Sequence, residues 1–310
     1  MADVVALTGA TGFVGGVVAA RLVSAGWRVR ALVRPASDDR RLTARVERVP
    51  GSLEDPASLG RLVRGVRAVV HCAGLVRGVS RADFERVNVD GVVRLARAAA
   101  REVPAPRVIL VSSAAARQPA LSDYAASKLA GERALAAGAA EWTVLRPPAL
   151  YGPGDRELLP LLQWMRRGVG LVLGPPSARF SLLYVEDLAD ALVRLVQTDG
   201  LASAAFELHD GRPAGYAWDD VLAAVGRLRG RAVRRVAVPG SALRLLAHAN
   251  VLLAGARGRA PMLTPGKVRE LQHPDWVCDN AALSAATGWT PRIGLDAGLS
   301  RTLGLPADGR

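Results

Sequence analysis

Short apolar runs alternate with amphipathic stretches along the first half of the chain. Continuous apolar runs are typical of strands in a parallel sheet covered on both faces. They predict strands over Val4–Leu7, Val29–Val33, Val46–Val49, Ala68–Cys72, Val108–Ser112 and Thr143–Leu145. The stretches between them have helical periodicity and predict helices over Phe13–Ala25, Ala57–Arg64, Ala82–Glu102 and Tyr124–Gly138. This alternation predicts an α/β fold, a Rossmann-type doubly wound parallel sheet.

The pattern changes after Leu150. Turn-forming residues cluster at 151–155 and 174–176, a helical pattern returns over Val185–Gln197, and short mixed elements follow. We therefore expect a first domain made of residues 1–150 with roughly 180–205. Residues 151–179 and 206–310 are expected to form a smaller C-terminal substrate-binding lobe.

The segment Ser241–Ala256 is strongly apolar, interrupted by Arg244 and His248 and followed by two further arginines. It is too short to cross a bilayer. Two interpretations stay open. The segment is a helix packed on its own protein, or it is an interfacial helix that contacts lipid.

The formal net charge of +13 raises the question of a nucleic-acid partner. The basic residues are scattered arginines, however, with lysines only at Lys128 and Lys267, and no basic run is interleaved with aromatic residues. We therefore expect no nucleic-acid partner. A positive surface would instead favour anionic cofactors or anionic membranes.

Two cysteines, Cys72 and Cys278, make no disulfide framework, and no zinc-binding spacing occurs, so no metal site is expected. The N-terminus runs directly into a strand pattern without a signal peptide. These features predict a cytoplasmic protein. If Ser241–Ala256 contacts lipid, the protein would be bound peripherally at the inner face of a membrane.

A glycine-rich turn follows the first predicted strand and opens the first predicted helix. Its sequence is Gly9-Ala-Thr-Gly12-Phe-Val-Gly15. Glycines permit the tight turn and let backbone amides approach a diphosphate, while the helix N-terminus adds partial positive charge. The turn predicts a dinucleotide site that uses Gly9, Thr11, Gly12, Phe13, Val14 and Gly15, and it makes the first domain a dinucleotide-binding domain.

The end of the second predicted strand bears on the choice of dinucleotide. A carboxylate there would bind the ribose hydroxyls of NAD, but this strand ends in Arg34, with Arg40 and Arg41 nearby. An arginine in that place suits the extra phosphate of NADP(H). NADP(H) is the favoured cofactor, and NAD(H) remains the alternative with Arg34 as an ordinary surface residue.

The second chemical signal is Tyr124-Ala-Ala-Ser-Lys128. A spacing of four places the phenol and the ammonium on one helical face, where the cation would stabilise a tyrosinate. Upstream, the strand ending in Val111-Ser112-Ser113 offers a hydroxyl that would polarise a substrate carbonyl. We favour Ser113 over Ser112 for that role.

These motifs resemble those of the extended short-chain dehydrogenase/reductases, also called the NAD-dependent epimerase/dehydratase family. The resemblance also includes His71-Cys-Ala-Gly74, Asn88-Val-Asp-Gly91, Leu145–Asp155 and Phe180–Asp187. It implies that Tyr124 exchanges a proton with the substrate oxygen, that Lys128 tunes Tyr124 and binds ribose, and that Ser113 orients the carbonyl. It further implies that Asn88 supports Lys128 and that further cofactor contacts come from Ser52, Leu53, Cys72, Ala73, Gly74 and Pro147.

Departures from the family pattern narrow the expected chemistry. Ala114 and Ala115 stand where sugar-nucleotide dehydratases carry an Asp-Glu pair, and Ala149 stands where many epimerases carry Asn. With these two chemistries disfavoured, the chain resembles the ketone-reducing branch of the family, the dihydroflavonol-reductase-like and 3β-hydroxysteroid-dehydrogenase-like enzymes. We expect a monomer or homodimer that reduces a ketone, or oxidises a secondary alcohol, on a hydrophobic substrate such as a sterol or 3-keto sphingolipid.

Two other functions stay open on fold-level analogy. One is a nucleotide-sugar epimerase with bound NAD. The other is a non-catalytic dinucleotide-binding sensor or assembly factor.

Overall fold

The structure, a computed structural model, describes residues 3–40, 42–201, 203–256 and 260–306. The chain divides into two compact units. The first contains residues 1–146, 188–206 and 282–289, and the second contains residues 147–187, 207–281 and 290–310.

The first unit is built on a seven-stranded sheet with the order β11-β6-β5-β4-β1-β2-β3. Adjacent strands from β3 through β6 pair in parallel. The strands are β1 (Val4–Thr8), β2 (Arg28–Val33), β3 (Val46–Pro50), β4 (Ala68–His71), β5 (Arg107–Val111), β6 (Trp142–Arg146) and β11 (Ala204–Glu207). The predicted Rossmann-type doubly wound fold is confirmed, and β11 adds a strand that the apolar pattern did not indicate.

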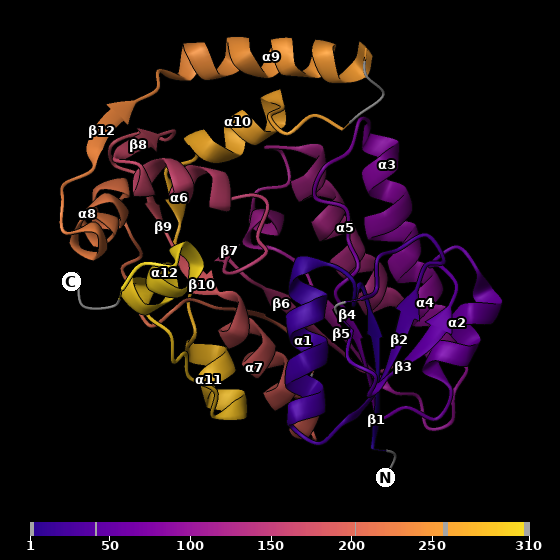
Figure 1. Cartoon of the computed structure of the whole chain (residues 1–310). Coiled ribbons are helices and arrows are strands. Elements are labelled where there is room, and N and C mark those ends of the chain that lie inside the picture. The colour runs from indigo at the N-terminus through magenta and orange to yellow at the C-terminus, as the bar shows by residue number, and fades with distance from the viewer. Residues whose placement is uncertain (1–2, 41, 202, 257–259, 307–310) are drawn as a thin grey trace. The chain divides into compact units, whose positions relative to one another are not determined.

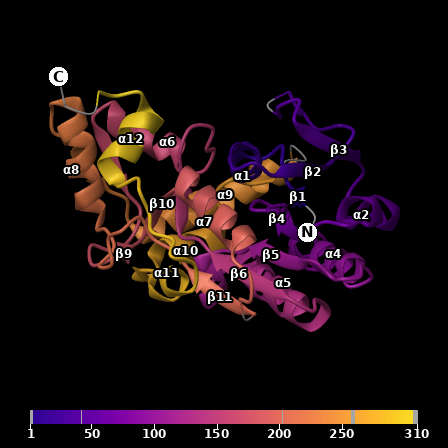
Figure 2. The ribbon, with the colours of Figure 1, turned by 90° about the horizontal axis from the view of Figure 1, so that it is seen from below.

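Helices cover both faces of this sheet. On one face, α2 (Pro56–Val63), α4 (Gly91–Ala99) and α5 (Asp123–Gly138) bury their apolar stripes against the strands. On the other face lie α1 (Phe13–Ser24) and α7 (Val185–Gln197), joined by the ion pair between Arg21 and Asp190 (Figure 2). Because both faces are covered, the strands are continuously apolar.

The predicted single helix over Ala82–Glu102 is interrupted. A capping box at Ser80 begins α3 (Arg81–Glu85), a π-helical turn follows over Arg86–Asp90, and α4 then ends at Ala99. An ideal Cβ placed on Gly131 of α5 would overlap the Asn88 carbonyl oxygen. The wide turn therefore brings the backbone of residue 88 directly against α5. Such turns often occur at functional sites.

The second unit contains three two-stranded parallel pairs. These pair β7 (Ala149–Tyr151) with β10 (Leu182–Tyr184), β8 (Val169–Val172) with β12 (Arg234–Ala237), and β9 (Arg179–Phe180) with β13 (Asp275–Trp276). Its main core lies among α6 (Leu159–Arg166), α8 (Trp218–Arg229) and α12 (Leu295–Leu303). A small separate core lies between α9 (Gly240–Ala256) and α10 (Pro265–Gln272), drawn in orange in Figure 1.

The remaining helix, α11 (Ala281–Thr287), comes near the end of the chain. Within the described residues, no helix combines the length and apolar character needed to cross a membrane.

Candidate active site

The strand order reverses direction at β1, which lies between β2 and β4. In open parallel sheets, ligands bind beyond the carboxyl ends of the strands at such a point. The glycine-rich turn follows β1, and the segment Cys72–Gly74 follows β4. Two of the predicted cofactor-binding segments therefore begin side by side.

The geometry of the glycine-rich turn requires its glycines. Gly9 has φ of +74°, and a Cβ there would lie 2.6 Å from the backbone nitrogen of Ala73. A Cβ on Gly15 would overlap the Gly9 carbonyl oxygen. Gly12 caps α1 without any side chain, and the first turn, which includes Phe13 and Val14, contains no acidic residue. The amides at this end are thus open to an anion, and the turn fits a dinucleotide diphosphate.

Arg34 is exposed immediately after β2, and its side chain makes no hydrogen bond or ion pair with the described residues. The neighbouring Arg40 is instead bound to Asp38 at 2.9 Å, while Arg41 lies outside the described residues. Arg48 occupies the other nearby carboxylate, Asp39, at 2.6 Å. Of the two arginines described at this strand end, Arg34 is therefore the one available to a ligand.

Ser52 and Leu53 follow β3. The Ser52 hydroxyl accepts a hydrogen bond from the Glu54 amide at 3.2 Å. Leu53 packs against Gly91 at the start of α4 and against the sheet core. Both residues lie at the carboxyl edge of the sheet, but the side chain of Leu53 is used for packing.

A buried network holds Cys72–Gly74 next to β1. The Thr8 hydroxyl bonds the His71 ring at 2.6 Å and accepts from the Ala73 amide at 3.2 Å. Burial, reinforced by the Lys128 charge, lowers the pKa of His71 to about 3, so its ring is neutral. Burial also raises the pKa of Cys72 to about 12, so it stays a thiol. A Cβ added to Gly74 would lie 3.7 Å from Lys128 Nζ, which places this segment beside the lysine.

Lys128 is a buried cation on α5. Its Nζ donates to the Val111 carbonyl at 2.8 Å, at the end of β5. Burial lowers the pKa of Lys128 to about 8, and the nearby Glu132 carboxylate partly opposes this. One turn earlier on the same helix, Tyr124 is half-buried, and its ring meets Phe84 edge-on at 6.3 Å between centroids. The predicted pair therefore shares one face of α5.

Asn88 ties the π-helical turn to the start of α5. Its side-chain oxygen accepts from the Leu75 amide at 2.7 Å, and its amide donates to the Leu75 carbonyl and to Ser127 Oγ, both at 2.9 Å. Ser127 in turn donates to the Tyr124 carbonyl at 2.8 Å. Asn88 thus connects the segment after β4 with the helix that carries Tyr124 and Lys128.

The two serines after β5 have different environments. Ser112 is buried and donates to the Glu132 carboxylate at 2.5 Å. Ser113 is half-buried, and its hydroxyl oxygen accepts from the Ala115 amide at 3.2 Å, capping a 3₁₀ turn (Ala114–Arg117). Among the described residues Ser113 makes no other side-chain bond, so its hydroxyl hydrogen is available to a substrate oxygen. This geometry favours Ser113.

Sequence reasoning missed Glu132 and Arg146. Arg146 at the end of β6 forms a forked ion pair with Glu132, with a shortest distance of 2.5 Å. The spacing of four between Lys128 and Glu132 was the available signal, because it places an acid on the helical face that buries the lysine. Of the residues predicted to bind cofactor, Pro147 is buried and is the first residue of the second unit.

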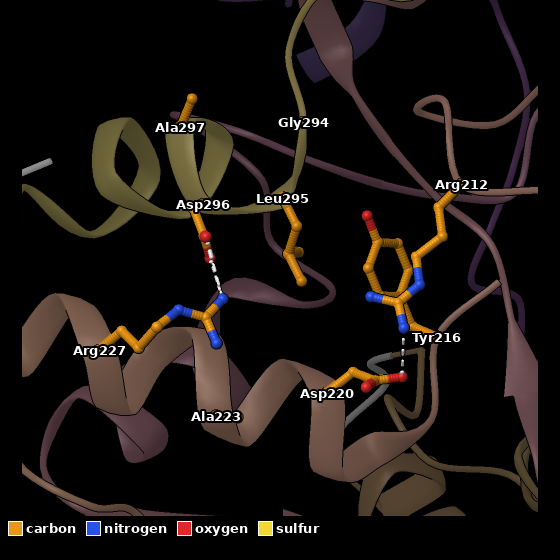
Figure 3. A pocket seen from close by; sticks show the side chains of 9 residues that line it. All are labelled: Arg212, Tyr216, Asp220, Ala223, Arg227, Gly294, Leu295, Asp296 and Ala297. Carbon is orange, nitrogen blue, oxygen red and sulfur yellow. Dashed lines mark hydrogen bonds and ion pairs between the residues drawn. The ribbon is translucent and has the colours of Figure 1, made fainter.

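The second unit contains a separate pocket of about 350 Å³ between α8 and the start of α12 (Figure 3). Its charged side chains neutralise one another, with Arg227 bound to Asp296 at 2.8 Å and Arg212 to Asp220 at 3.2 Å. None of the predicted site residues lines it. A phenol also lines it, that of Tyr216, but its hydroxyl already donates to the Asp210 carboxylate at 2.7 Å.

Sequence comparisons place the chain in a family. Residues 5–207 match the NAD dependent epimerase/dehydratase family. The ceramide reductase of Caulobacter vibrioides is 40% identical over 97% of this chain and 93% of its own length. The 2-alkyl-3-oxoalkanoate reductase of Stenotrophomonas maltophilia is 28% identical over 95% of this chain and 97% of its own.

Among solved structures, a UDP-glucose 4-epimerase from Thermotoga maritima superimposes with a TM-score of 0.74. It covers 97% of both chains at 20% identity, so the likeness concerns the fold. The family match and the two reductase relatives also indicate the type of reaction, which is NAD(P)-dependent oxidoreduction. The chain belongs to the NAD-dependent epimerase/dehydratase family, and it is an NAD(P)-dependent oxidoreductase of the extended short-chain dehydrogenase/reductase type.

Proposed function

We propose that the protein uses NADPH to reduce a ketone on a ceramide-like lipid to a secondary alcohol. The observation that carries the proposal is the 40% identity to a ceramide reductase across nearly the whole of both chains. The arrangement of Tyr124, Lys128 and Ser113 supports a carbonyl reduction, because it offers a proton donor, a cation and a second hydroxyl donor.

The site residues fit a bound dinucleotide. The turn from Gly9 to Gly15 would hold the diphosphate, Arg34 the extra phosphate of NADPH, and Lys128 the nicotinamide ribose. When bound, the cofactor supplies the hydride that is transferred to the carbonyl carbon. The protein supplies the proton and the orientation of the substrate.

The roles of the chain's own residues follow from their contacts. Ser113 donates a hydrogen bond to the substrate oxygen, which polarises the carbonyl. Tyr124 transfers its phenolic proton to that oxygen as the carbon is reduced, so the product is the neutral alcohol. The Lys128 ammonium, held by the Val111 carbonyl, stabilises the tyrosinate that remains. Asn88 fixes the start of α5 and acts as a positioning residue.

Titration with NADPH and NADH, followed by addition of a keto-ceramide, tests the proposal. We expect tighter binding of NADPH, and its oxidation once the lipid ketone is added. Arg34→Ser should weaken NADPH binding by about 10- to 100-fold, because a charge-assisted phosphate contact is lost, and should leave NADH binding unchanged. Arg40→Ser is the matched control, since Arg40 is already bound to Asp38.

Other results would point elsewhere. Preference for NADH together with turnover of a nucleotide sugar would support an epimerase. NADPH binding without turnover of any ketone in a broad panel would support a non-catalytic role. Equal loss of NADPH binding in Arg34→Ser and Arg40→Ser would contradict the assignment of Arg34.

The buried Lys128 predicts a pH dependence. Its ammonium is present below its pKa of about 8 and is lost above it, so kcat/KM should fall as the pH rises through about 8. The folded pKa lies below the ordinary value of 10.5, so the unfolded chain binds more protons between these values. The contribution of Lys128 to the free energy of unfolding therefore rises with pH in this window. Deprotonation of Lys128 thus does not unfold the protein, and the expected fall in kcat/KM is not a loss of stability.

Glu132→Gln should move the fall in kcat/KM to lower pH, because the carboxylate helps to hold the charge on Lys128. Glu141→Gln, an exposed acid beside Arg107, is the control. If kcat/KM had the same pH profile in the wild type and in Glu132→Gln, Lys128 would not be the group whose titration causes the fall at high pH.

A further inference from the structure

One face of α9 packs on the second unit. Leu243 and Ala247 are buried with Val268 of α10, and Leu173 and Val238 pack against them. Ala254 is buried on the same side of the helix. The spacing of 243, 247 and 254 follows one helical stripe. These contacts fix α9 as an ordered helix on its own protein.

The opposite face of α9 is apolar and open to solvent. Leu245 and Leu252 are 72% and 75% exposed, and Leu246 and Leu253 are 56% and 57% exposed. Within each pair the residues are seven positions apart, so the four leucines lie in adjacent rows along one side of the helix. Figure 1 shows α10 along one side of α9 within this unit. A continuous apolar surface of this kind marks an interaction site.

The segment around this surface is rich in basic residues, although Arg235 is bound to Asp219 at 3.0 Å and Lys267 to Glu270 at 2.9 Å. Residues 221–269 contain no aspartate or glutamate, and they contain ten basic residues: Arg227, Arg229, Arg231, Arg234, Arg235, Arg244, Arg257, Arg259, Lys267 and Arg269. Arg244 and His248 are exposed on α9 itself, beside the leucines. Exposed leucines flanked by arginines on a helix without acidic residues are characteristic of interfacial helices on anionic lipid.

We propose that α9 docks the protein on an anionic membrane, with Leu245, Leu246, Leu252 and Leu253 inserted at the acyl boundary. A second copy of the chain is the less favourable occupant, because a symmetric contact through α9 would bring two basic segments together. The proposal extends the proposed function, since a ceramide-like substrate would reside in the same bilayer. The docking itself does not depend on the identity of the substrate.

Vesicle binding by the full-length protein tests the proposal. We expect the wild type to sediment with vesicles of phosphatidylcholine and phosphatidylglycerol, and to bind vesicles of phosphatidylcholine alone much more weakly. Added salt should weaken binding, because the electrostatic part is screened. Leu245→Asp combined with Leu252→Asp should lower the partition coefficient at least about tenfold.

Ala57→Asp combined with Val103→Asp provides the charge-matched control. Both positions are exposed in the first unit, and this variant should bind vesicles far better than the α9 variant. Equal binding by the two variants, or no binding of the wild type to anionic vesicles, would overturn the proposal. So would a wild-type dimer in solution that the α9 variant abolishes.

A soluble short-chain keto-ceramide separates this proposal from the proposed function. The α9 variant should reduce it at the wild-type rate, because α9 contains no residue assigned to the chemistry, while its turnover of ketone embedded in vesicles should fall at least about tenfold. Vesicle binding without turnover of either substrate would contradict the function and leave the docking intact. Turnover of both substrates by a protein that does not bind vesicles would contradict the docking alone.

Discussion

Tyr124→Phe is expected to lower kcat by about 10²- to 10⁴-fold, while the affinity for NADPH stays unchanged. The substitution removes only the phenolic hydroxyl, which is the group that transfers the proton, and general acid catalysis contributes in this range. The aromatic ring and its edge contact with Phe84 remain. Single-turnover oxidation of NADPH by a saturating lipid ketone measures the effect on the chemical step.

Tyr151→Phe is the matched control for this prediction. The Tyr151 hydroxyl is buried and has no hydrogen-bond partner among the described residues, so its removal should leave turnover unchanged. If Tyr124→Phe kept wild-type turnover, the acid would have to be another group. If it lost NADPH binding as well, the hydroxyl would belong to the cofactor contacts rather than to the proton transfer.

Arg146→Met is expected to lower the free energy of unfolding of the first unit by about 3 kcal/mol. Glu132 is only 6% exposed, and the variant leaves its carboxylate buried with the Ser112 hydroxyl as its remaining hydrogen-bond partner among the described residues. A buried charge that has lost its ion-pair partner is costly because the protein interior solvates it poorly. Urea denaturation followed by circular dichroism measures the loss.

Two further variants separate this cost from the loss of an ordinary ion pair. Arg227→Met removes the exposed partner of Asp296 and should cost less than about 1 kcal/mol. Adding Glu132→Gln to Arg146→Met removes the stranded charge and should recover much of the stability. A cost for Arg146→Met no greater than that for Arg227→Met would show that Glu132 is well solvated without its arginine.

The elements that the sequence predicts well are those with a local cause. The central strands of the sheet are continuous apolar runs, and the conformation of the glycine-rich turn is determined by its own glycines. The spacing of Tyr124 and Lys128 is also local, because four positions along a helix always share a face. Strand β11 (Ala204–Glu207) was missed because it lies at the edge of the sheet and only Phe206 is buried in it, so it lacks the buried apolar run of the central strands.

The remaining features depend on tertiary contacts. The Glu132 carboxylate meets Ser112 and Arg146 only because β5 and β6 pair in parallel beneath α5. The π-helical turn at Asn88 leaves no mark on the apolar periodicity of Ala82–Glu102. For Ser241–Ala256 the sequence left a packed helix and an interfacial helix open. The structure shows one packed face and one exposed face, so the two interpretations are compatible.

The π-helical turn restricts how this chain can change in length. The turn over Arg86–Asp90 accommodates one residue more than a regular α-helix would, and loss of any one residue there would restore the regular helix. The flanking segments α3 and α4 would keep their faces, because the wide turn is what absorbs the extra residue, but the residues within the turn would shift by one position. Asn88 lies within the turn, so such a shift would move its side chain away from Leu75 and Ser127. Surface loops tolerate single-residue deletions, but deletions in this segment should be rare among homologous sequences.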